Sequence, residues 1–522
     1  MKKSLKITLV CALALIMLIG CGFSPAASAV TLSQSASSGE AVLLSGATAS
    51  SKTTAVTADS AQIDAAVSNR DASGEYDAAE AVSLSPDGDL TITEAGTYIL
   101  SGTYEGMIVV EAGEEDKVQL VLENATIRNE SGPAIFVRSA DKVFLTAAEG
   151  TVNMISDGSD YTLTDDDATL DAAVFSRDDL TINGSGKLTI HGNYKHAVVS
   201  KDDLVITAKD LTVNAQNVGL SGKDSVRFSE AAVGITAGSD GVRSDNGSDA
   251  DKGFVSVADS TLTIVSGKDG VQAETVFTAE NAALSITSGG GSSARSADAS
   301  ESCKGIKAGV SISISSGVYT IDALDDAIHT NGSILISGGA FTLRSRDDGV
   351  HANEKVEIAG GTLDITASEG IEGTYVLLSG GDVTITASDD GVNAARKSSA
   401  YTPTVEISGG TLTITMGAGD TDGVDSNGNI IITGGTISIS GNSSFDYDGT
   451  ATFTGGTVIV NGQQLSSIPN QFMGGGPGGM GGFGGGLGGQ GGFGGGQGGQ
   501  GGFGGGPGGQ GGFGGGPGGG RS

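Results

Sequence analysis

Short runs in which apolar and polar residues alternate follow one another from about residue 76 to residue 464. The clearest stretch, 324–366, holds two copies of one unit of about 22 residues. Each copy opens with two aspartates, a small residue and an aliphatic residue, and continues into two alternating runs separated by Gly-Gly. Alternation with a period of two is typical of strands that bury one face. The unit therefore predicts a turn of short strands that repeats along the chain.

The pair of a small residue and the aliphatic residue after it sets the register of this repeat. Several steps between pairs are 21, 22 or 24 residues, and the longer steps contain polar insertions near 157–168, 244–252, 290–302 and 396–403. A repeat of this length indicates a solenoid, whereas a propeller blade needs about 40 residues. We predict an all-β protein, a parallel β-helix in which the aliphatic residues form one inward column. The column is Ile135, Val174, Val198, Leu220, Val242, Val271, Ile306, Ile328, Val350, Ile371, Val392 and Val424.

A second apolar column follows the Gly-Gly pairs, which mark a repeated turn with unusual backbone dihedrals. Its members alternate with Thr and Ser, so we predict that they point inward. On this interpretation Tyr319 and Phe341 stack in the core and are not exposed platforms for sugars. The column is Tyr319, Phe341, Leu363, Val383, Leu412, Ile437 and Val458.

The start of the chain differs from the repeats. Lys2 and Lys3 precede an apolar run over 7–19, which is typical of a secretory signal. The end of this run, Leu18-Ile19-Gly20-Cys21, resembles the bacterial lipobox. The resemblance implies a lipoprotein signal peptide over 1–20 and acylation of Cys21, which would anchor a secreted protein to the outer face of the bacterial cell membrane. An ordinary signal peptide cut near 27–29 is the alternative.

Composition divides the rest of the chain into three predicted parts. Residues 21–75 are rich in Ala, Ser and Thr and are predicted to be a flexible tether. Residues 76–465 are predicted to form the β-helix. Residues 466–522 are Gly-rich with Phe at a ten-residue spacing, and are predicted to be a disordered tail. The tail is either a contact for wall polymer and other chains or a simple extension.

The formal net charge of −33 excludes an electrostatic footprint for nucleic acid, because no large basic patch is present. Such a charge attracts cations instead. Cys303 is the lone cysteine beyond the leader, so no internal disulfide is expected.

Aligning the openings of the units places carboxylates in register on successive turns. Strands of neighbouring turns lie about 4.8 Å apart, so stacked carboxylates repel one another and raise their own pKa values. Calcium resolves this repulsion, because it accepts six to eight oxygen ligands, and Asn353, Asn393 and Asn427 could add to them. The alternative is ordinary solvated aspartates of turns. The candidate ligands are Asp240, Asp269, Asp325, Asp326, Asp347, Asp348, Asp389, Asp390, Asp422 and Asp425.

Four other residues interrupt these acidic columns. Lys304 and Lys307 could supply the base of a polysaccharide lyase, which must remove the proton next to a uronate carboxyl group. They could equally be counter-ions that replace the metal in their turn. His329 and His351 suggest zinc, but no third His or Cys joins them.

The chain resembles a known family at these residues. Strands of the type SGGTLTIT (408–415), the openings DDAI and DDGV, the start TYILSGTYEGMIVV (97–110), the lipobox and the Gly-rich tail are similar to the bacterial carbohydrate-binding domain-containing β-helix proteins. The clostridial member binds cellulose and polygalacturonate, and its fold is similar to that of calcium-dependent family 9 pectate lyases. The resemblance implies a right-handed parallel β-helix, bound calcium, and polysaccharide binding without proven cleavage.

We therefore expect a cell-surface protein that binds polysaccharide through calcium held by stacked aspartates. Acidic (uronate) or plant cell-wall glycans such as polygalacturonate or cellulose are the expected partners. The absence of Trp argues against flat crystalline cellulose, since indole rings are the strongest stackers. A calcium-dependent lyase and a structural surface adhesin are the alternatives.

Overall fold

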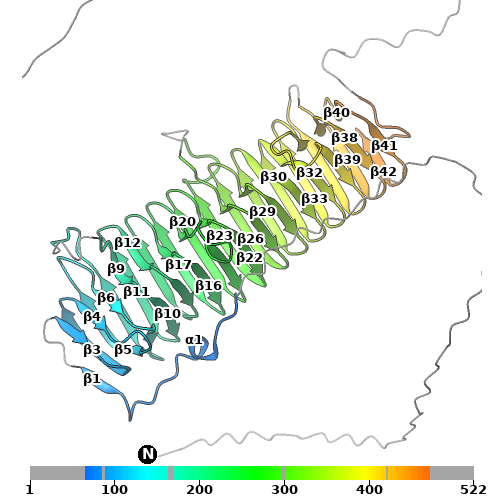
Figure 1. Cartoon of the computed structure of the whole chain (residues 1–522). Helices are drawn as coiled ribbons and strands as arrows, with labels where there is room; N and C mark the ends of the chain where they lie inside the picture. Colours follow the sequence, from blue (N-terminus) through cyan, green and yellow to red (C-terminus); the bar gives the residue numbers. More distant parts are fainter. Residues whose placement is uncertain (1–64, 85–88, 163–168, 296–300, 419–420, 471–522) are drawn as a thin grey trace, which may run out of the picture. The chain divides into compact units, whose positions relative to one another are not determined.

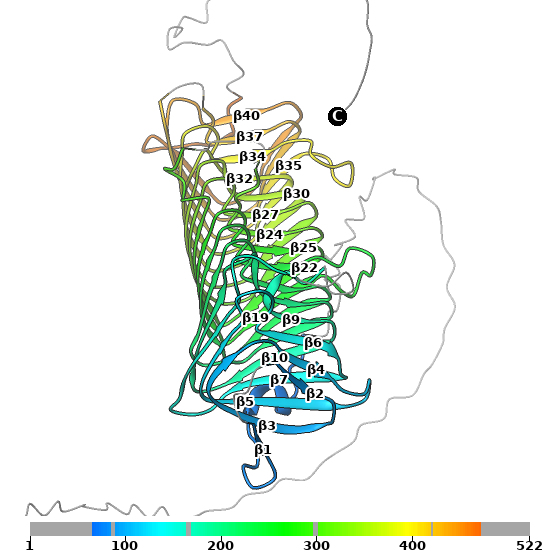
Figure 2. The ribbon, with the colours of Figure 1, turned by 90° about the vertical axis from the view of Figure 1, so that its left-hand side faces the viewer.

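The computed structural model describes residues 65–84, 89–162, 169–295, 301–418 and 421–470. These residues form a parallel β-helix whose coils stack along one axis (Figures 1 and 2). Each full coil crosses three columns of hydrogen-bonded strands, which we call ladders A, B and C in chain order. The predicted all-β parallel β-helix is confirmed.

Ladder A contains the strands that follow the openings of the repeat. Its strands are β2 (Leu90–Ile92), β4 (Ile108–Glu111), β6 (Ile135–Ser139), β9 (Ala172–Ser176), β12 (His196–Ser200), β15 (Leu220–Gly222), β18 (Val242–Ser244), β21 (Val271–Ala273), β24 (Ile306–Ala308), β27 (Ile328–Thr330), the first parts of β30 (Asp348–Ile358) and β32 (Glu369–Leu378), β34 (Val392–Ala394), β37 (Val424–Ser426) and β40 (Phe445–Tyr447).

Ladder B follows ladder A in each coil, and β30 and β32 bend from one into the other without a break. Its strands are β1 (Val82–Leu84), the first parts of β3 (Gly96–Glu105) and β5 (Lys117–Arg128), β7 (Lys142–Ala147), β10 (Asp179–Gly184), β13 (Asp203–Ile206), β16 (Ser225–Ser229), β19 (Phe254–Ala258), β22 (Val276–Glu280), β25 (Ser311–Ile314), β28 (Ser333–Ile336), the second parts of β30 and β32, β35 (Thr404–Ile407), β38 (Asn429–Ile432) and β41 (Ala451–Phe453).

Ladder C closes each coil and begins directly after the Gly-Gly turns. Its strands are the second parts of β3 and β5, β8 (Val152–Ser156), β11 (Lys187–Gly192), β14 (Leu211–Ala215), β17 (Ala232–Ala237), β20 (Thr261–Ser266), β23 (Ala282–Ser288), β26 (Gly317–Ala323), β29 (Ala340–Ser345), β31 (Thr362–Ala367), β33 (Asp382–Ala387), β36 (Thr411–Met416), β39 (Thr436–Ser440) and β42 (Thr457–Val460); the short β43 (Gln463–Gln464) pairs antiparallel with β42.

The register confirms both apolar columns. In ladder A each aliphatic residue from Ile135 to Val424 pairs with the next member of the predicted column, and all are at most 2% exposed. The column continues to Ile108 and Phe445, which the pattern of small and aliphatic residues missed. In ladder C the rings of Tyr319 and Phe341 stack inside the core with centroids 4.6 Å apart.

The Gly-Gly turns join ladder B to ladder C in a backbone conformation that favours glycine. The second glycine of each pair has a positive φ, for example 74° at Gly410. A Cβ atom on Gly410 would lie 2.6 Å from the carbonyl oxygen of Gly380 in the preceding coil. These turns therefore lack side chains because the coils approach too closely to admit them.

Part of the predicted tether packs on the side of the β-helix. The short helix α1 (Asn69–Ser73) contacts β10. Asp71 is buried there, where it accepts a hydrogen bond from Thr181 at 2.5 Å and pairs with Lys142 at 2.8 Å. The Thr207 hydroxyl donates to the carbonyl oxygen of Asp71 at 2.6 Å. The predicted boundary at residue 76 thus lies within a segment, 65–81, that leads from this contact into β1.

Several predicted features lie outside the described residues: the signal peptide, Cys21, most of the tether, and the Gly-rich tail beyond residue 470. Within the described ranges, no helix has the length and apolar character needed to cross a bilayer. Cys303 is a buried free thiol.

Candidate functional site

The candidate ligands line the turn that leads into ladder A. The second residue of each opening forms a central column: Asp240, Asp269, Lys304, Asp326, Asp348, Glu369, Asp390 and Asp422. Backbone hydrogen bonds fix this column, since the amide after each residue donates to the carbonyl oxygen of the next column member, as from Gly241 to Asp269 and from Gly391 to Asp422. The predicted alignment of the openings is therefore the alignment found in the fold.

One carboxylate oxygen of many central residues accepts a backbone hydrogen bond from the next coil. Asp326 Oδ1 accepts from the amide of Asp348 at 3.1 Å, and Asp390 Oδ1 from the amide of Asp422 at 3.0 Å. Asp240 and Asp269 do the same at 3.3 and 2.8 Å. These aspartates cap the backbone of the turn, which gives them a structural role whether or not a metal is bound.

The candidate residues differ in exposure along the chain. Asp240, Asp269, Asp326 and Asp348 are buried, so they are not the solvated turn residues of the alternative interpretation. Asp325, Asp390, Asp422 and Asp425 are half-buried, and Asp347 and Asp389 are exposed. The contacts described below join residues of the same coil or of neighbouring coils. The ten predicted calcium ligands therefore form several small groups along the β-helix.

A second column lies beside the central one and supplies cations to part of it. This outer column pairs Arg243, Gln272, Lys307, His329, His351, Glu372, Asn393, Asp425 and Asp446 in sequence. Lys307 Nζ lies 3.2 Å from Asp269 Oδ2, and His329 Nδ1 lies 2.7 Å from Asp326 Oδ2. The carboxylates of these coils therefore have protein cations as neighbours.

Lys304, within the central column, is held by two carboxylates. Its Nζ lies 2.8 Å from Asp325 Oδ2 and 2.7 Å from Asp326 Oδ2. Burial alone would lower the pKa of Lys304, but the charges and hydrogen bonds of these aspartates raise it. A catalytic base needs a lowered pKa near the working pH, so this environment favours the counter-ion role for Lys304.

His351 joins carboxylates from two coils. Its Nδ1 lies 2.5 Å from Asp348 Oδ2 and 3.0 Å from Glu372 Oε2, and its Nε2 lies 3.2 Å from Asn353 Oδ1. Burial would lower the pKa of His351, but the two carboxylates raise it to about 10. Lys397, from the insertion 396–403, adds an ion pair with Glu372 at 2.9 Å. The imidazolium thus occupies a place between coils that a metal could otherwise fill.

The last coils of the site have a different balance of charge. Among the described residues no Lys, Arg or His forms an ion pair with Asp390 or Asp425. Burial, with the charges of Asp389 and Asp422, raises the pKa of Asp390 to about 6. Burial, followed by the charges of Asp390, Asp422 and Asp446, raises the pKa of Asp425 to about 7. We call Asp389, Asp390, Asn393, Asp422, Asp425 and Asp446 the C-terminal acidic group.

Two buried oxygens of this group make no hydrogen bond within the described part of the chain: Asn393 Oδ1 and Asp446 Oδ1. A buried polar atom without a partner is costly. The donors of the group are all oxygens, which suit calcium. The C-terminal acidic group therefore fits a calcium ion chemically.

Three sets of side chains in the described ranges bring possible ligand atoms within 4.8 Å of one another, and none of them includes a residue of the C-terminal acidic group. They are Asp325, Asp326 and Asp347; Asp326, His329 and His351; and Asp348, His351 and Glu372. A third ligand, a carboxylate, thus does lie beside His329 and His351, whose rings are 4.7 Å apart. The Nδ1 atoms of both histidines already contact carboxylates, however, and Lys304 already contacts the first set.

Comparison with known proteins identifies the family. The family model of the carbohydrate-binding domain-containing proteins matches residues 86–349 and 344–466. The chain belongs to this family. The resemblance read from the repeat is therefore confirmed.

Family members and a solved structure resemble parts of the chain. A carbohydrate-binding domain-containing protein of Acetivibrio thermocellus is 37% identical over 129 residues, which is 24% of this chain and 45% of the relative. The match thus spans less than half of the relative's length. A solved structure described as a polysaccharide lyase-like protein from C. thermocellum, a gadolinium derivative, is 33% identical; the match covers 43% of this chain and 87% of that chain, with a TM-score of 0.40.

The chain has a second acidic cluster, which was not among the sequence-based candidates. Asp202, Asp203 and Asp224 line a cavity of about 280 Å³ together with Arg227 and Lys252. Burial, followed by a hydrogen bond with the Asp224 carboxylate, raises the pKa of Asp202 to about 7. The Asp-Asp pairs at 178–179 and 202–203 were a visible signal, but they precede ladder B and so fall outside the alignment of the ladder A openings.

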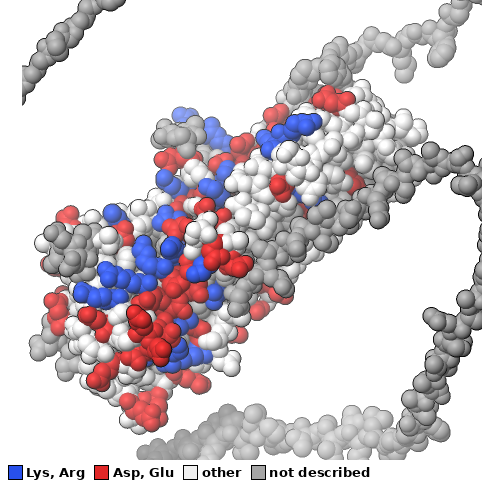
Figure 3. All heavy atoms as spheres, in the orientation of Figure 1, with Lys and Arg blue, Asp and Glu red and all other residues white. Residues whose placement is uncertain are grey.

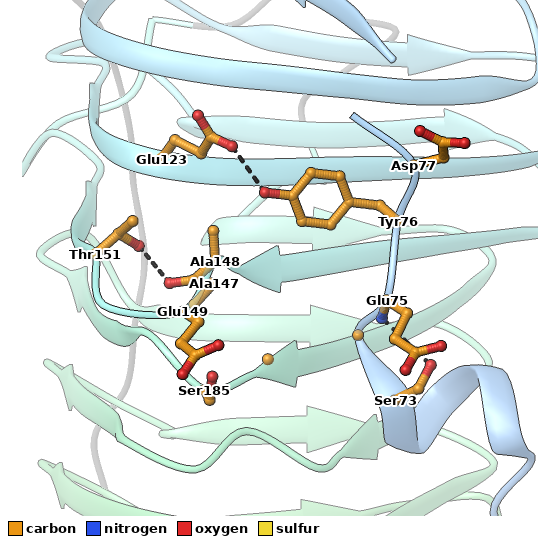
Figure 4. A pocket seen from close by; sticks show the side chains of 12 residues that line it. Ser73, Glu75, Tyr76, Asp77, Glu123, Ala147, Ala148, Glu149, Thr151 and Ser185 are labelled. Carbon is orange, nitrogen blue, oxygen red and sulfur yellow. Dashed lines mark hydrogen bonds between the residues drawn. The ribbon is translucent and has the colours of Figure 1, made fainter. Parts of the chain in front are cut away.

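A larger cavity, of about 960 Å³, lies where the segment after α1 crosses the side of the β-helix. Figure 4 shows Tyr76 pointing toward Glu123, to which its hydroxyl donates at 2.7 Å, with Glu75 and Glu149 nearby. Sequence reasoning missed it because one wall belongs to the predicted tether.

On the side shown in Figure 3, charged side chains of both signs gather over the N-terminal half, whereas few cover the C-terminal coils.

Proposed function

We propose that this protein binds polysaccharide at the bacterial cell surface, and that calcium in the C-terminal acidic group bridges it to an anionic glycan such as polygalacturonate. The observation that carries the proposal is the charge balance of the central and outer columns. Protein cations pair with Asp269, Asp326 and Glu372, whereas Asp390 and Asp425 form no ion pair with any described residue. Membership of the carbohydrate-binding family supports the polysaccharide as partner.

Asp390, Asp425, Asp446 and Asn393 are the residues that would hold the ion. Calcium would supply positive charge there and leave part of its coordination to a ligand. A uronate polymer carries the same sign of charge as this protein, whose net charge is −33. A bridging cation removes that repulsion, whereas direct contact would increase it.

The earlier coils have a different proposed role. Asp240, Asp269 and Asp326 cap the backbone. Together with Asp348 they pair with the cations of this stretch, which are Arg243, Lys307, His329, Lys304 and His351. We infer that these pairs hold the coils together. At Asp325 and Asp347 calcium would have to compete with the Lys304 ammonium group.

Binding to polygalacturonate, with and without chelator, tests the proposal. We expect binding in calcium, loss of binding with chelator, and loss in the double variant Asp390→Asn/Asp425→Asn. Asp210→Asn/Glu280→Gln removes the same charge from exposed positions outside the columns and should bind as the unmodified protein does. Equal binding by both double variants would remove the assigned site. A rise in absorbance from unsaturated uronates during the assay would support the lyase alternative.

We also propose that Cys21, outside the described residues, anchors the protein as a lipoprotein. The support is the lipobox-like sequence that ends the apolar run. Cys21→Ala should release the protein into the medium. Retention of that variant in the membrane fraction at the unmodified level would contradict the anchor.

A further inference from the structure

Side chains of three consecutive coils meet at His351. His329 of β27, His351 of β30 and Glu372 of β32 pair in register in the outer column of ladder A (Figure 2). Asp348, from the same coil as His351, forms a set with His351 and Glu372 whose ligand atoms lie within 4.8 Å of one another. All three residues of this set are at most 9% exposed. The set is therefore largely removed from solvent.

Hydrogen bonding decides which nitrogen of His351 faces the carboxylates. Its Nε2 lies 3.2 Å from Asn353 Oδ1, an oxygen that only accepts, so Nε2 carries a proton. The Asn353 amide is oriented in turn by Nδ2, which donates to Asn331 Oδ1 at 3.5 Å. The Nδ1 atom of His351 then faces Asp348 Oδ2 at 2.5 Å and Glu372 Oε2 at 3.0 Å. A positive charge must lie among these three atoms, because a nitrogen lone pair and two carboxylates otherwise repel one another.

A proton on Nδ1 of His351 is one such charge, but it satisfies the arrangement only in part. One N–H group makes one well-directed hydrogen bond, whereas two carboxylates converge on this nitrogen. A zinc ion accepts a nitrogen and two carboxylate oxygens together, at about 2.0–2.2 Å. Imidazole is a ligand of zinc and its neighbouring transition metals, while calcium takes oxygen ligands. The nitrogen in the set therefore favours a transition metal over calcium.

His329 offers a fourth ligand from the preceding coil. Its ring lies 4.7 Å from the ring of His351, and the two residues share a second set of ligand atoms within 4.8 Å, completed by Asp326. Asp326 Oδ2 contacts Nδ1 of His329 at 2.7 Å, so Nε2 of His329 remains for a metal. Contact of the other ring nitrogen with a carboxylate is usual for a metal-binding histidine. Two imidazoles and two carboxylates would balance the charge of a divalent ion.

The second oxygen of Glu372 also has a partner outside the set. Lys397 Nζ lies 2.9 Å from Glu372 Oε1, which leaves Oε2 to face His351. Lys397 belongs to the insertion near 396–403, and Asn353 holds His351 from the strand itself. Outer contacts of this kind orient the ligands of a metal ion. Three of the four candidate ligands are thus held by residues that would not themselves touch the ion: Asp326, Asn353 and Lys397.

We propose that His329, Asp348, His351 and Glu372 bind a divalent transition-metal ion such as zinc, which joins three coils. The two carboxylates take the place of the third His or Cys that the sequence lacks. When the ion binds Nδ1 of His351, the proton on that nitrogen passes to solvent; without the ion, the imidazolium occupies the same place. The site differs from the C-terminal acidic group in its residues and its metal and needs no glycan, so it goes beyond the proposed function.

Titration with cobalt(II), a coloured probe for zinc sites, tests the proposal. Full-length protein treated with chelator and dialysed should develop d–d absorption bands with cobalt and lose them when zinc is added. His351→Gln should abolish the bands. Asn353→Ala removes only the outer contact to Nε2, so it should weaken cobalt binding about tenfold. His191→Gln removes a half-buried histidine of ladder C and should titrate as the unmodified protein does.

Melting temperatures in chelator show whether the variants fold. If His351→Gln does not, Glu372→Gln keeps the shape of its side chain and should show the same loss of the bands. Absence of cobalt binding in the unmodified protein, or equal binding by the His351 and His191 variants, would overturn the site.

Calcium separates this inference from the proposed function. Excess calcium should leave the cobalt bands unchanged, because the site contains two imidazole ligands. Displacement of cobalt by calcium would contradict a transition-metal site. A normal cobalt titration in a protein that does not bind polygalacturonate in calcium would support this inference and overturn the proposed function.

Discussion

The coils from Asp240 to Glu372 and the coils from Asp389 to Asp446 share one backbone plan but differ in charge balance. In the first stretch, Lys, Arg and His side chains lie among the stacked carboxylates. In the second stretch, the same positions carry Asn393, Asp425 and Asp446. The backbone places the carboxylates in both stretches, so the neighbouring column decides whether the site is closed by the protein or open to a metal ion.

Removing a cation from the first stretch should have the largest effect. Lys304→Met would leave Asp325 and Asp326 without their ammonium partner, and breaking a buried pair costs about 3–5 kcal/mol. Denaturant unfolding in chelator measures this loss of unfolding free energy, and calcium should restore part of it. Lys209→Met removes an exposed partner of Glu230, for which a loss below about 1 kcal/mol is expected. Equal losses in the two variants would show that the Lys304 pair is not special.

Calcium should stabilise the second stretch. Binding to the folded state alone adds about 2.7 kcal/mol to the unfolding free energy at a hundredfold excess over Kd. We therefore expect a higher melting temperature in calcium than in chelator, and a smaller change in magnesium. Asp390→Asn/Asp425→Asn should remove most of the response. A response of the same size in that variant would place the ion elsewhere.

Introducing a cation into the second stretch should give its carboxylates a protein partner, as in the first stretch. Asp425 lies in the outer column that also holds Lys307, whose ammonium group pairs with a central aspartate of the preceding coil. Asp425→Lys should pair with Asp390 in the same way, raise the unfolding free energy in chelator by about 1 kcal/mol, and abolish the calcium response. Calorimetric heats of calcium binding, with Asp210→Lys as the exposed control, check this.

The smallest effect concerns pH and the separate cluster near Asp224. The pKa of Asp202 is raised to about 7, so the folded state holds a proton that the unfolded chain releases near pH 4. Stability from this group is present at low pH and is lost as the pH rises through 7. Asp202→Asn should flatten the dependence of melting temperature on pH between 5 and 8, by less than about 1 kcal/mol because the group is partly exposed. An unchanged pH profile would contradict the raised pKa of Asp202.

The fold was predictable because each repeat unit of the sequence forms a coil of the same geometry. Val350 and Phe341 each lie in a column whose members recur at one spacing, and parallel stacking turns equal spacing into contact. The pairing of Lys304 and Lys307 with aspartates followed from the same alignment. The contact of His351 with Glu372 was harder to predict, because it depends on the coil toward which the His351 imidazole ring points.

Contacts outside the repeat could not be predicted in this way. Lys397 reaches Glu372 from an insertion that has no counterpart in other coils. Asp71 lies in a stretch without periodicity, yet it is buried against β10. The backbone-capping role of the aspartates was not predictable either, since the sequence does not distinguish a carboxylate that accepts an amide hydrogen bond from one that binds a cation.

The contact between α1 and β10 has a mechanical consequence. A pull on the N-terminal side of the chain would enter the β-helix at Asp71, through its bonds to Lys142, Thr181 and Thr207. Three strands of neighbouring coils, β7, β10 and β13 with the residue that follows it, would share that load. Because forced unfolding is governed by the rate at which the loaded contacts open, this contact shields β1 at the end of the rod from being peeled away first.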